Sequence, residues 1–212
     1  MAQAIFYLLA GPNGAGKSSL YRAAVADRLI PAGAEFVNAD LYEAAHLQHI
    51  HNPQQRSEAA RDWADTRRAD LIAQGRSFVS ETVFSHPSKL SLITQAQKAG
   101  FAVVLLVVCM DNPTNLLARI RQRVSEGGHP VPEQRILERY PRTLGHLQRA
   151  VRLADLALLY DNPGSVTSSI SPPSRVASCR GNKTQVFAAV LPLWAKQVLA
   201  LPAPGNDAAL PS

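Results

Sequence analysis

Short apolar runs alternate with amphipathic, helix-forming stretches along most of the chain. Two of these runs, residues 4–10 and 101–110, are continuously apolar. Continuous runs of this length are typical of parallel strands that helices cover on both faces. Shorter strand signals fall at residues 35–38, 77–80 and 156–160. The alternation predicts an α/β fold with a mainly parallel sheet.

Helices are expected between these strands, because apolar residues recur at roughly helical spacing and Gly or Pro residues bound the segments. The predicted helices cover residues 17–29, 53–74, 87–98, 113–127 and 133–153.

The composition changes after residue 162, where Ser, Pro and Gly become frequent. We expect residues 1–162 to form the main domain and residues 163–184 to form a Ser/Pro-rich loop. Residues 185–201 regain apolar character and are expected to pack on the same domain as a strand or helix. Residues 202–212 are expected to form a flexible tail.

The loop after the first strand carries the most specific motif of the chain. Residues 11–18 read GPNGAGKS and match the pattern G-x-x-x-x-G-K-[ST] between a strand and a helix. In such a phosphate-binding loop (P-loop), Lys17 reaches the β- and γ-phosphates of a nucleotide and the Ser18 hydroxyl ligates Mg²⁺. A glycine-rich turn without a ligand is the alternative. The predicted nucleotide-binding residues are Gly11, Pro12, Asn13, Gly14, Ala15, Gly16, Lys17, Ser18 and Ser19.

Acidic residues follow two further predicted strands. Ligands of open α/β sheets bind beyond the carboxyl ends of the strands, so Asp40 is expected near the phosphates. A carboxylate there can accept a hydroxyl proton or hold Mg²⁺ through water, although Asp40 could instead cap a helix over residues 41–51. Glu81 and Thr82 occupy the matching place after residues 77–80. They could bind substrate hydroxyls, order the metal shell or form a capping pair in a turn.

Basic residues exceed acidic ones by 22 to 16, a formal net charge of +6. The total permits nucleic acid, a membrane surface or a small anion as a partner. Eight arginines fall within residues 119–152, opposed there by Glu126, Glu133 and Glu138. We expect a helix–turn–helix lid over about residues 119–145, with phosphate contacts from one or two of Arg123, Arg139 and Arg142, the other arginines being solvated.

The cysteines, the apolar runs and the aromatic content indicate the compartment and the partners of the protein. Two cysteines lack a CxxC spacing, and the longest apolar run is far short of the roughly 20 residues of a membrane span. We therefore expect a cytoplasmic protein that does not enter the membrane. Aromatic residues make up 6% of the chain, which speaks against nucleic acid as a partner.

Four segments in order, GPNGAGKSS, VNAD, SETVFS and RVSEGGHPVPEQRILERYPRTL, resemble the zeta-toxin family of small P-loop kinases in its compact stand-alone branch. The resemblance covers about residues 4–162. It implies a fold like that of nucleoside or shikimate kinases and ATP-dependent phosphorylation of the sugar 3′-hydroxyl of UDP-N-acetylglucosamine. It also implies an antitoxin protein as a candidate partner, although the lid spacing differs from the larger toxins and no antitoxin-binding region is evident.

By this resemblance Asp40 matches the catalytic base, Lys17 and Ser18 the ATP and Mg²⁺ residues, and Glu81 a substrate-site acid. Arg123 or Arg139 match the phosphate-binding arginines.

We therefore expect a P-loop kinase that moves the γ-phosphoryl group of ATP to a hydroxyl of a small anionic or nucleotide-linked substrate. Its catalytic residues would be Lys17, Asp40, Arg123 and Arg139, and its substrate residues Glu81, Thr82 and Arg142. The competing classes are a nucleotide-dependent switch or binding module, and a kinase for another metabolite or a nucleic-acid end.

Overall fold

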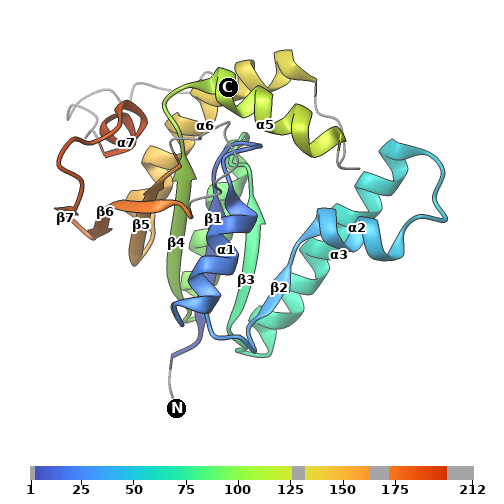
Figure 1. The fold of residues 1–212 in the computed structure, drawn as a ribbon. Coiled ribbons are helices and arrows are strands. Elements are labelled where there is room, and N and C mark those ends of the chain that lie inside the picture. Colours follow the sequence, from blue (N-terminus) through green and yellow to red (C-terminus); the bar gives the residue numbers. More distant parts are fainter. Residues whose placement is uncertain (1–2, 126–131, 163–171, 200–212) are drawn as a thin grey trace, which may run out of the picture.

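The computed structural model describes residues 3–125, 132–162 and 172–199, apart from the side chains of residues 122–124. Within these residues, seven strands form one sheet in the order β2–β3–β1–β4–β5–β6–β7 (Figure 1). The strands are β1 (Ile5–Ala10), β2 (Glu35–Val37), β3 (Phe78–Thr82), β4 (Ala102–Cys109), β5 (Leu156–Asp161), β6 (Ser174–Arg180) and β7 (Lys183–Val186). The first five in spatial order run parallel, whereas β6 and β7 are antiparallel to their neighbours. The predicted α/β fold is confirmed.

Helices cover both faces of this sheet. They are α1 (Lys17–Ala26), α2 (Ala39–His46), α3 (Pro53–Ala73), α4 (Leu90–Lys98), α5 (Pro113–Ser125), α6 (Glu133–Leu153) and α7 (Leu193–Leu199), with a 3₁₀ turn η1 (Pro87–Lys89) before α4. Figure 1 shows α2 and α3 standing out beside β2 as an arm, while α5 lies across one end of the sheet. In the described ranges, every helix is too short or too polar to cross a membrane.

Two apolar cores form because successive strand residues point to opposite faces. In β1, Phe6 and Leu8 pack with α3, α4, α6 and α7, whereas Tyr7 and Leu9 pack with α1 and α5. The central strand β4 is buried from residue 105 to residue 109, as its continuous apolar run predicts. The central strands are therefore held from both sides, and their carboxyl ends form a common edge.

Some predicted boundaries differ from the structure. Helix α1 ends at Ala26, three residues before the predicted end, because the chain turns at Arg28 with φ 59°. Strand β3 continues through Glu81 and Thr82, which were expected to follow it. Helix α2 covers Ala39–His46 rather than residues 41–51, so Asp40 lies inside its first turn.

The C-terminal part departs most from expectation. The predicted loop over residues 163–184 is wrong in its second half, because β6 and β7 extend the sheet there as an antiparallel hairpin. Residues 163–171, the 202–212 tail and the turn at residues 126–131 of the expected lid lie outside the described residues. Trp194 of α7 is buried in the same core as Leu147 of α6, so α7 packs on the main sheet domain.

Candidate active site

The P-loop between β1 and α1 has a backbone conformation that requires glycine. Gly16 has φ 99°, and a Cβ built there would lie 2.3 Å from Nδ2 of Asn162. A Cβ at Gly11 would lie 2.0 Å from the backbone oxygen of Val108 in β4. Gly16 is also the N-cap of α1, and no side chain of the described residues caps this helix. The first-turn N–H groups of α1 are therefore arranged as in helix N-termini that bind phosphate.

Lys17 lies folded back over this loop. Its Nζ donates hydrogen bonds to the backbone oxygens of Gly11 at 3.0 Å and Pro12 at 3.2 Å. The same nitrogen lies 3.5 Å from Oε1 of Glu81, and the Lys17 side chain is only 7% exposed. A buried ammonium group is tolerated here because a carboxylate and two carbonyl oxygens surround it.

Glu81 connects the P-loop to the end of β2. It lies opposite Leu9 of β1 in the parallel ladder, one residue before the end of that strand. Its Oε2 accepts a hydrogen bond from Nδ2 of Asn38 at 3.1 Å. Glu81 therefore contacts two polar groups across the sheet edge, Lys17 and Asn38. This differs from the capping role that was the alternative prediction for Glu81.

Asn38 was not selected from the sequence. Its Oδ1 accepts the backbone N–H of Leu41 at 3.2 Å, so it is the N-cap of α2 while its Nδ2 holds Glu81. The signal that could have found it is its place, since Asn38 directly follows β2 at the carboxyl edge.

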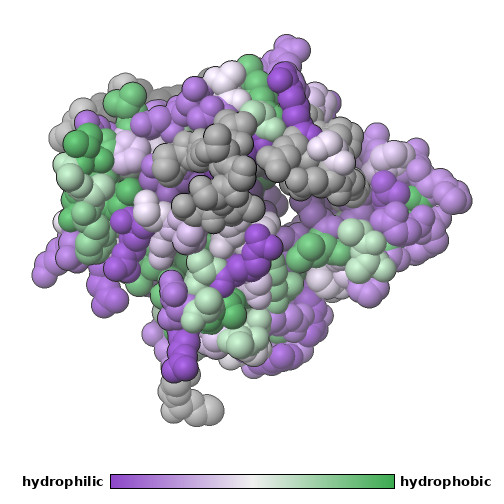
Figure 2. Space-filling model, viewed as in Figure 1, coloured by the Kyte–Doolittle hydropathy of each residue, from purple (hydrophilic) through white to green (hydrophobic). Residues whose placement is uncertain are grey.

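Asp40 is exposed in the first turn of α2. The alternative that Asp40 caps a helix is wrong, because Asn38 provides the cap. Since β3 lies between β2 and β1, these two strands are about 10 Å apart at the usual strand spacing, and β2 ends level with Leu8, two residues before the end of β1. Figure 2 shows the surface hollowed between the α2–α3 arm and the body of the molecule.

Thr82 has the turn role that was one of its two alternatives. Its Oγ1 accepts the backbone N–H of Phe84 at 3.3 Å. Phe84 is fully buried and has φ 58°, which is uncommon for a bulky residue. The chain leaving β3 is thereby held in one tight path.

A buried arginine supports the strand ends from the other face. Arg68 of α3 donates to Oγ of Ser80 at 3.3 Å, and Ser80 Oγ donates to the backbone oxygen of Val37 at 3.1 Å. Arg68 also pairs with Asp65, and desolvation lowers the pKa of its guanidinium. This network fixes α3 against the residues that precede Asn38 and Glu81.

The metal-binding prediction concerns Ser18, which is exposed in the first turn of α1. The next residue, Ser19, lies 3.5 Å from a guanidinium nitrogen of Arg22 through its Oγ. Within the described ranges, no group of three or more His, Cys, Asp or Glu side chains could hold a metal ion. This donor set fits Mg²⁺ carried with nucleotide phosphates, because such Mg²⁺ takes only one or two protein ligands.

The lid arginines are distributed unevenly. The Arg123 side chain lies outside the described residues. Arg139 is half-buried, and Arg142 is exposed with its Nε donating to the backbone oxygen of Glu138 at 3.3 Å. Arg121 and Glu133 form an exposed bidentate pair that joins α5 to α6. Phosphate contacts of Arg123, Arg139 and Arg142 stay predictions.

Arg119 of α5 lies beside the P-loop. It donates to Oδ1 of Asn162 at 3.0 Å, and Asn162 in turn donates to the backbone oxygen of Ala15 at 2.9 Å. Neither residue was selected as a site residue from the sequence, and the contact of Asn162 with the P-loop joins residues 147 positions apart in the chain.

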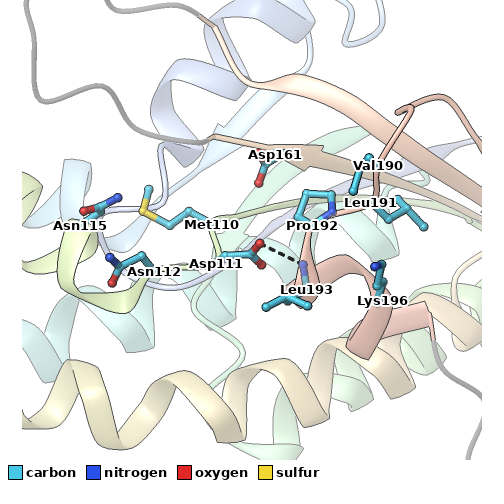
Figure 3. Close-up of a pocket in the computed structure, with 10 residues that line it drawn as sticks. All are labelled: Met110, Asp111, Asn112, Asn115, Asp161, Val190, Leu191, Pro192, Leu193 and Lys196. Carbon is cyan, nitrogen blue, oxygen red and sulfur yellow. Dashed lines mark hydrogen bonds between the residues drawn. The ribbon is translucent and has the colours of Figure 1, made fainter.

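A pocket of about 370 Å³ lies beyond the ends of β4 and β5 (Figure 3). Asp111 lies in it and accepts the backbone N–H groups of Leu193 and Trp194 at 2.9 and 2.7 Å. Asp161 accepts the indole N–H of Trp194 at 2.8 Å, and burial raises the pKa of its carboxyl. These carboxylates attach α7 to the strand ends.

A glycine-rich phosphate loop at the carboxyl edge of a mainly parallel sheet defines a P-loop kinase fold. The family model described as zeta toxin matches residues 2–167, and the chain belongs to the zeta-toxin family. Comparison with curated proteins found no match.

Solved structures share the fold. A structure of the PezAT chromosomal toxin–antitoxin system of Streptococcus pneumoniae matches with a TM-score of 0.60 and 16% identity, covering 81% of this chain and 75% of that chain. The AvrRxo1-ORF1:ORF2 complex with ATP matches with a TM-score of 0.63 and 19% identity, covering 87% and 61%. The Pnkp1/Rnl/Hen1 RNA repair complex matches with a TM-score of 0.54 and 15% identity, covering 70% and 47%.

Proposed function

We propose that this protein is an ATP-dependent kinase that transfers the γ-phosphoryl group of ATP to a hydroxyl of a small anionic or nucleotide-linked acceptor. The observation that carries the proposal is the position of Lys17, between the P-loop carbonyls and Glu81, at the edge where β1, β3 and β2 end. The ATP in the AvrRxo1 complex of the same fold supports ATP as the donor. Family membership supports the kinase class.

The acceptor would bind between the P-loop and Asp40. A spacing of about 10 Å between β1 and β2 leaves room for a γ-phosphoryl group and an acceptor hydroxyl in line. Glu81 and Thr82 lie on the intervening strand β3, where Glu81 could accept a hydrogen bond from the acceptor.

In the proposed reaction, the acceptor oxygen attacks the γ-phosphorus as its proton passes to the Asp40 carboxylate, and the bond to the β-phosphate oxygen breaks to release ADP. Lys17 would leave its loop carbonyls to stabilise charge on the transferring group, with Arg123 and Arg139 as further donors. Mg²⁺ bound with ATP would be held by the Ser18 hydroxyl and would neutralise phosphate charge. Residues 1–162 would carry all of these steps.

We propose the sugar 3′-hydroxyl of UDP-N-acetylglucosamine as the first acceptor to test, because this is the acceptor that zeta-toxin family resemblance implies. Arg142 would then contact the acceptor's phosphates. An antitoxin protein is the proposed partner, and the toxin–antitoxin system of the PezAT structure supports it.

The Asp40→Asn variant tests the base. It keeps the shape of the side chain but cannot accept the proton, so kcat should fall by about 100- to 10,000-fold while ATP affinity is kept. Asp62→Asn, at an exposed position of α3, is the matched control. Near-normal turnover of Asp40→Asn would refute this role.

The acceptor class has its own test. Mass spectrometry of a metabolite extract incubated with the protein and ATP should reveal a small molecule that gains one phosphate. Slow hydrolysis of ATP with no phosphorylated acceptor would instead indicate a nucleotide-dependent switch. Phosphorylation of an oligonucleotide end would indicate a nucleic-acid kinase.

A further inference from the structure

Asn162 joins three parts of the fold at the end of β5. Its backbone N–H donates to the backbone oxygen of Cys109 at the end of β4, at 2.9 Å. Its side chain donates to Ala15 of the P-loop and accepts from Arg119 of α5, and the residue is only 7% exposed. Every polar atom of this amide side chain therefore has a partner, which fixes its orientation.

Arg119 is held close to the point where the P-loop becomes α1. A Cβ built on Gly16 would lie 3.8 Å from one guanidinium nitrogen of Arg119. A different nitrogen of the same guanidinium bonds Asn162. One terminal nitrogen of the guanidinium therefore bonds Asn162, while the other lies near the loop at Gly16.

Among the described residues, the Arg119 guanidinium is bonded to the neutral amide of Asn162. In the described part of the chain, no carboxylate oxygen lies within 4.0 Å of it, whereas Arg56, Arg67 and Arg121 each pair with a glutamate. Desolvation by the surrounding protein lowers the pKa of the Arg119 guanidinium. Arg119 is half-buried, and a partly desolvated guanidinium bonded to a neutral amide gains more from an added anion than a fully solvated one does.

We propose that Arg119 binds the α- and β-phosphates of the nucleotide. Asn162 is the positioning residue, because it bonds both Arg119 and the P-loop and so fixes the place of the guanidinium relative to the loop. This inference rests on the proposed use of a nucleoside triphosphate. The diphosphate is the matching group because the backbone N–H groups of a P-loop hold the α- and β-phosphates, and Gly16 belongs to that backbone. A guanidinium fork can bind oxygens of both.

Titration with ATP, ADP, AMP and adenosine tests the contact by Arg119. Arg119→Gln should weaken the binding of ATP and of ADP by a similar factor of about 10 to 100, because one charge-assisted contact is lost. Adenosine affinity should not change, and the loss for AMP should be smaller. Arg121→Gln, two residues along the same helix and exposed, is the control and should leave all four affinities unchanged.

Two outcomes would overturn this assignment. Loss of ATP affinity with unchanged ADP affinity would place Arg119 at the γ-phosphate instead. Unchanged ADP affinity together with unchanged ATP affinity would remove Arg119 from the site.

The positioning role of Asn162 is tested by a double-mutant cycle with Arg119. Asn162→Ala should weaken the binding of ADP by about the same factor as Arg119→Gln does. In steady-state kinetics it should raise KM for ATP more than it lowers kcat. In the Arg119→Gln background the same change should have a clearly smaller effect, because only its contact with the P-loop at Ala15 is left to lose. Fully additive effects, with the thermal midpoint of each variant measured alongside, would contradict the positioning role.

These results are separable from the proposed reaction. Nucleotide binding that depends on Arg119 in a protein without acceptor phosphorylation would keep this inference and refute the kinase function. Acceptor phosphorylation by an Arg119→Gln variant with normal ADP affinity would do the reverse.

Discussion

Two basic regions of the molecule differ in how their cations are held. At the P-loop, Lys17 is buried and bonded, and Arg119 is tied to Asn162. Along α6, Arg135, Arg142 and Arg149 are exposed. Helix α6 carries five arginines, but the first region is the one arranged around a phosphate loop.

The difference shows which cations of a basic chain are prepared for an anion. An exposed arginine is already solvated, so an added contact gains little free energy. A cation that hydrogen bonds already hold in one geometry loses less freedom when an anion binds, and partial desolvation strengthens the new contact. Burial and hydrogen-bond partners are therefore better guides to the phosphate site than the density of arginine along the chain.

The largest expected effect is at Lys17. Lys17→Met keeps much of the side-chain volume but removes the charge beside the P-loop, so kcat/KM for ATP should fall by about 1,000-fold or more. Lys98→Met, at the exposed end of α4, is the matched control. Steady-state kinetics would measure kcat/KM of both variants. Comparable values for Lys17→Met and Lys98→Met would show that the buried cation at the P-loop matters no more than an exposed one.

A smaller effect is expected at Glu81. Glu81→Gln keeps the shape that faces Asn38 but removes the charge near Lys17, so kcat should fall by about 10- to 100-fold. Glu35→Gln removes the Arg67 pair at the opposite end of β2 and serves as the control. Retained turnover in Glu81→Gln would mean that Lys17 does not need this carboxylate.

The smallest effect is expected on α6. Arg149 is exposed, so Arg149→Gln should change kcat/KM for ATP and acceptor by less than about twofold. The assay is the same steady-state measurement. A loss comparable to that of Arg119→Gln would show that the exposed arginines act in the site after all.

The sequence predicts the centre of this site better than its surroundings. The P-loop is local, so its motif alone locates Lys17 and Ser18. Glu81 follows from the rule that strand ends share one edge, but its contact with Lys17 depends on β3 lying next to β1, which the sequence does not state. Asn38 and Asn162 follow strands in the same way and could have been found by that rule.

The C-terminal hairpin was missed for a different reason. The composition of residues 163–184 is typical of a loop, and β7 is exposed along its whole length, so no apolar alternation indicates a strand. These strands form because β5 offers a free edge, which is a property of the folded sheet.

The most direct test of the account is the fate of the γ-phosphoryl group in the wild-type protein. ATP labelled at the γ-position is incubated with the protein and UDP-N-acetylglucosamine or the acceptor found in the extract, and the label is counted on acceptor and on inorganic phosphate. The account predicts that ATP consumption requires the acceptor and that one labelled phosphate appears on the acceptor for each ADP formed. Label that appears only as inorganic phosphate, at a rate indifferent to every acceptor, would contradict it.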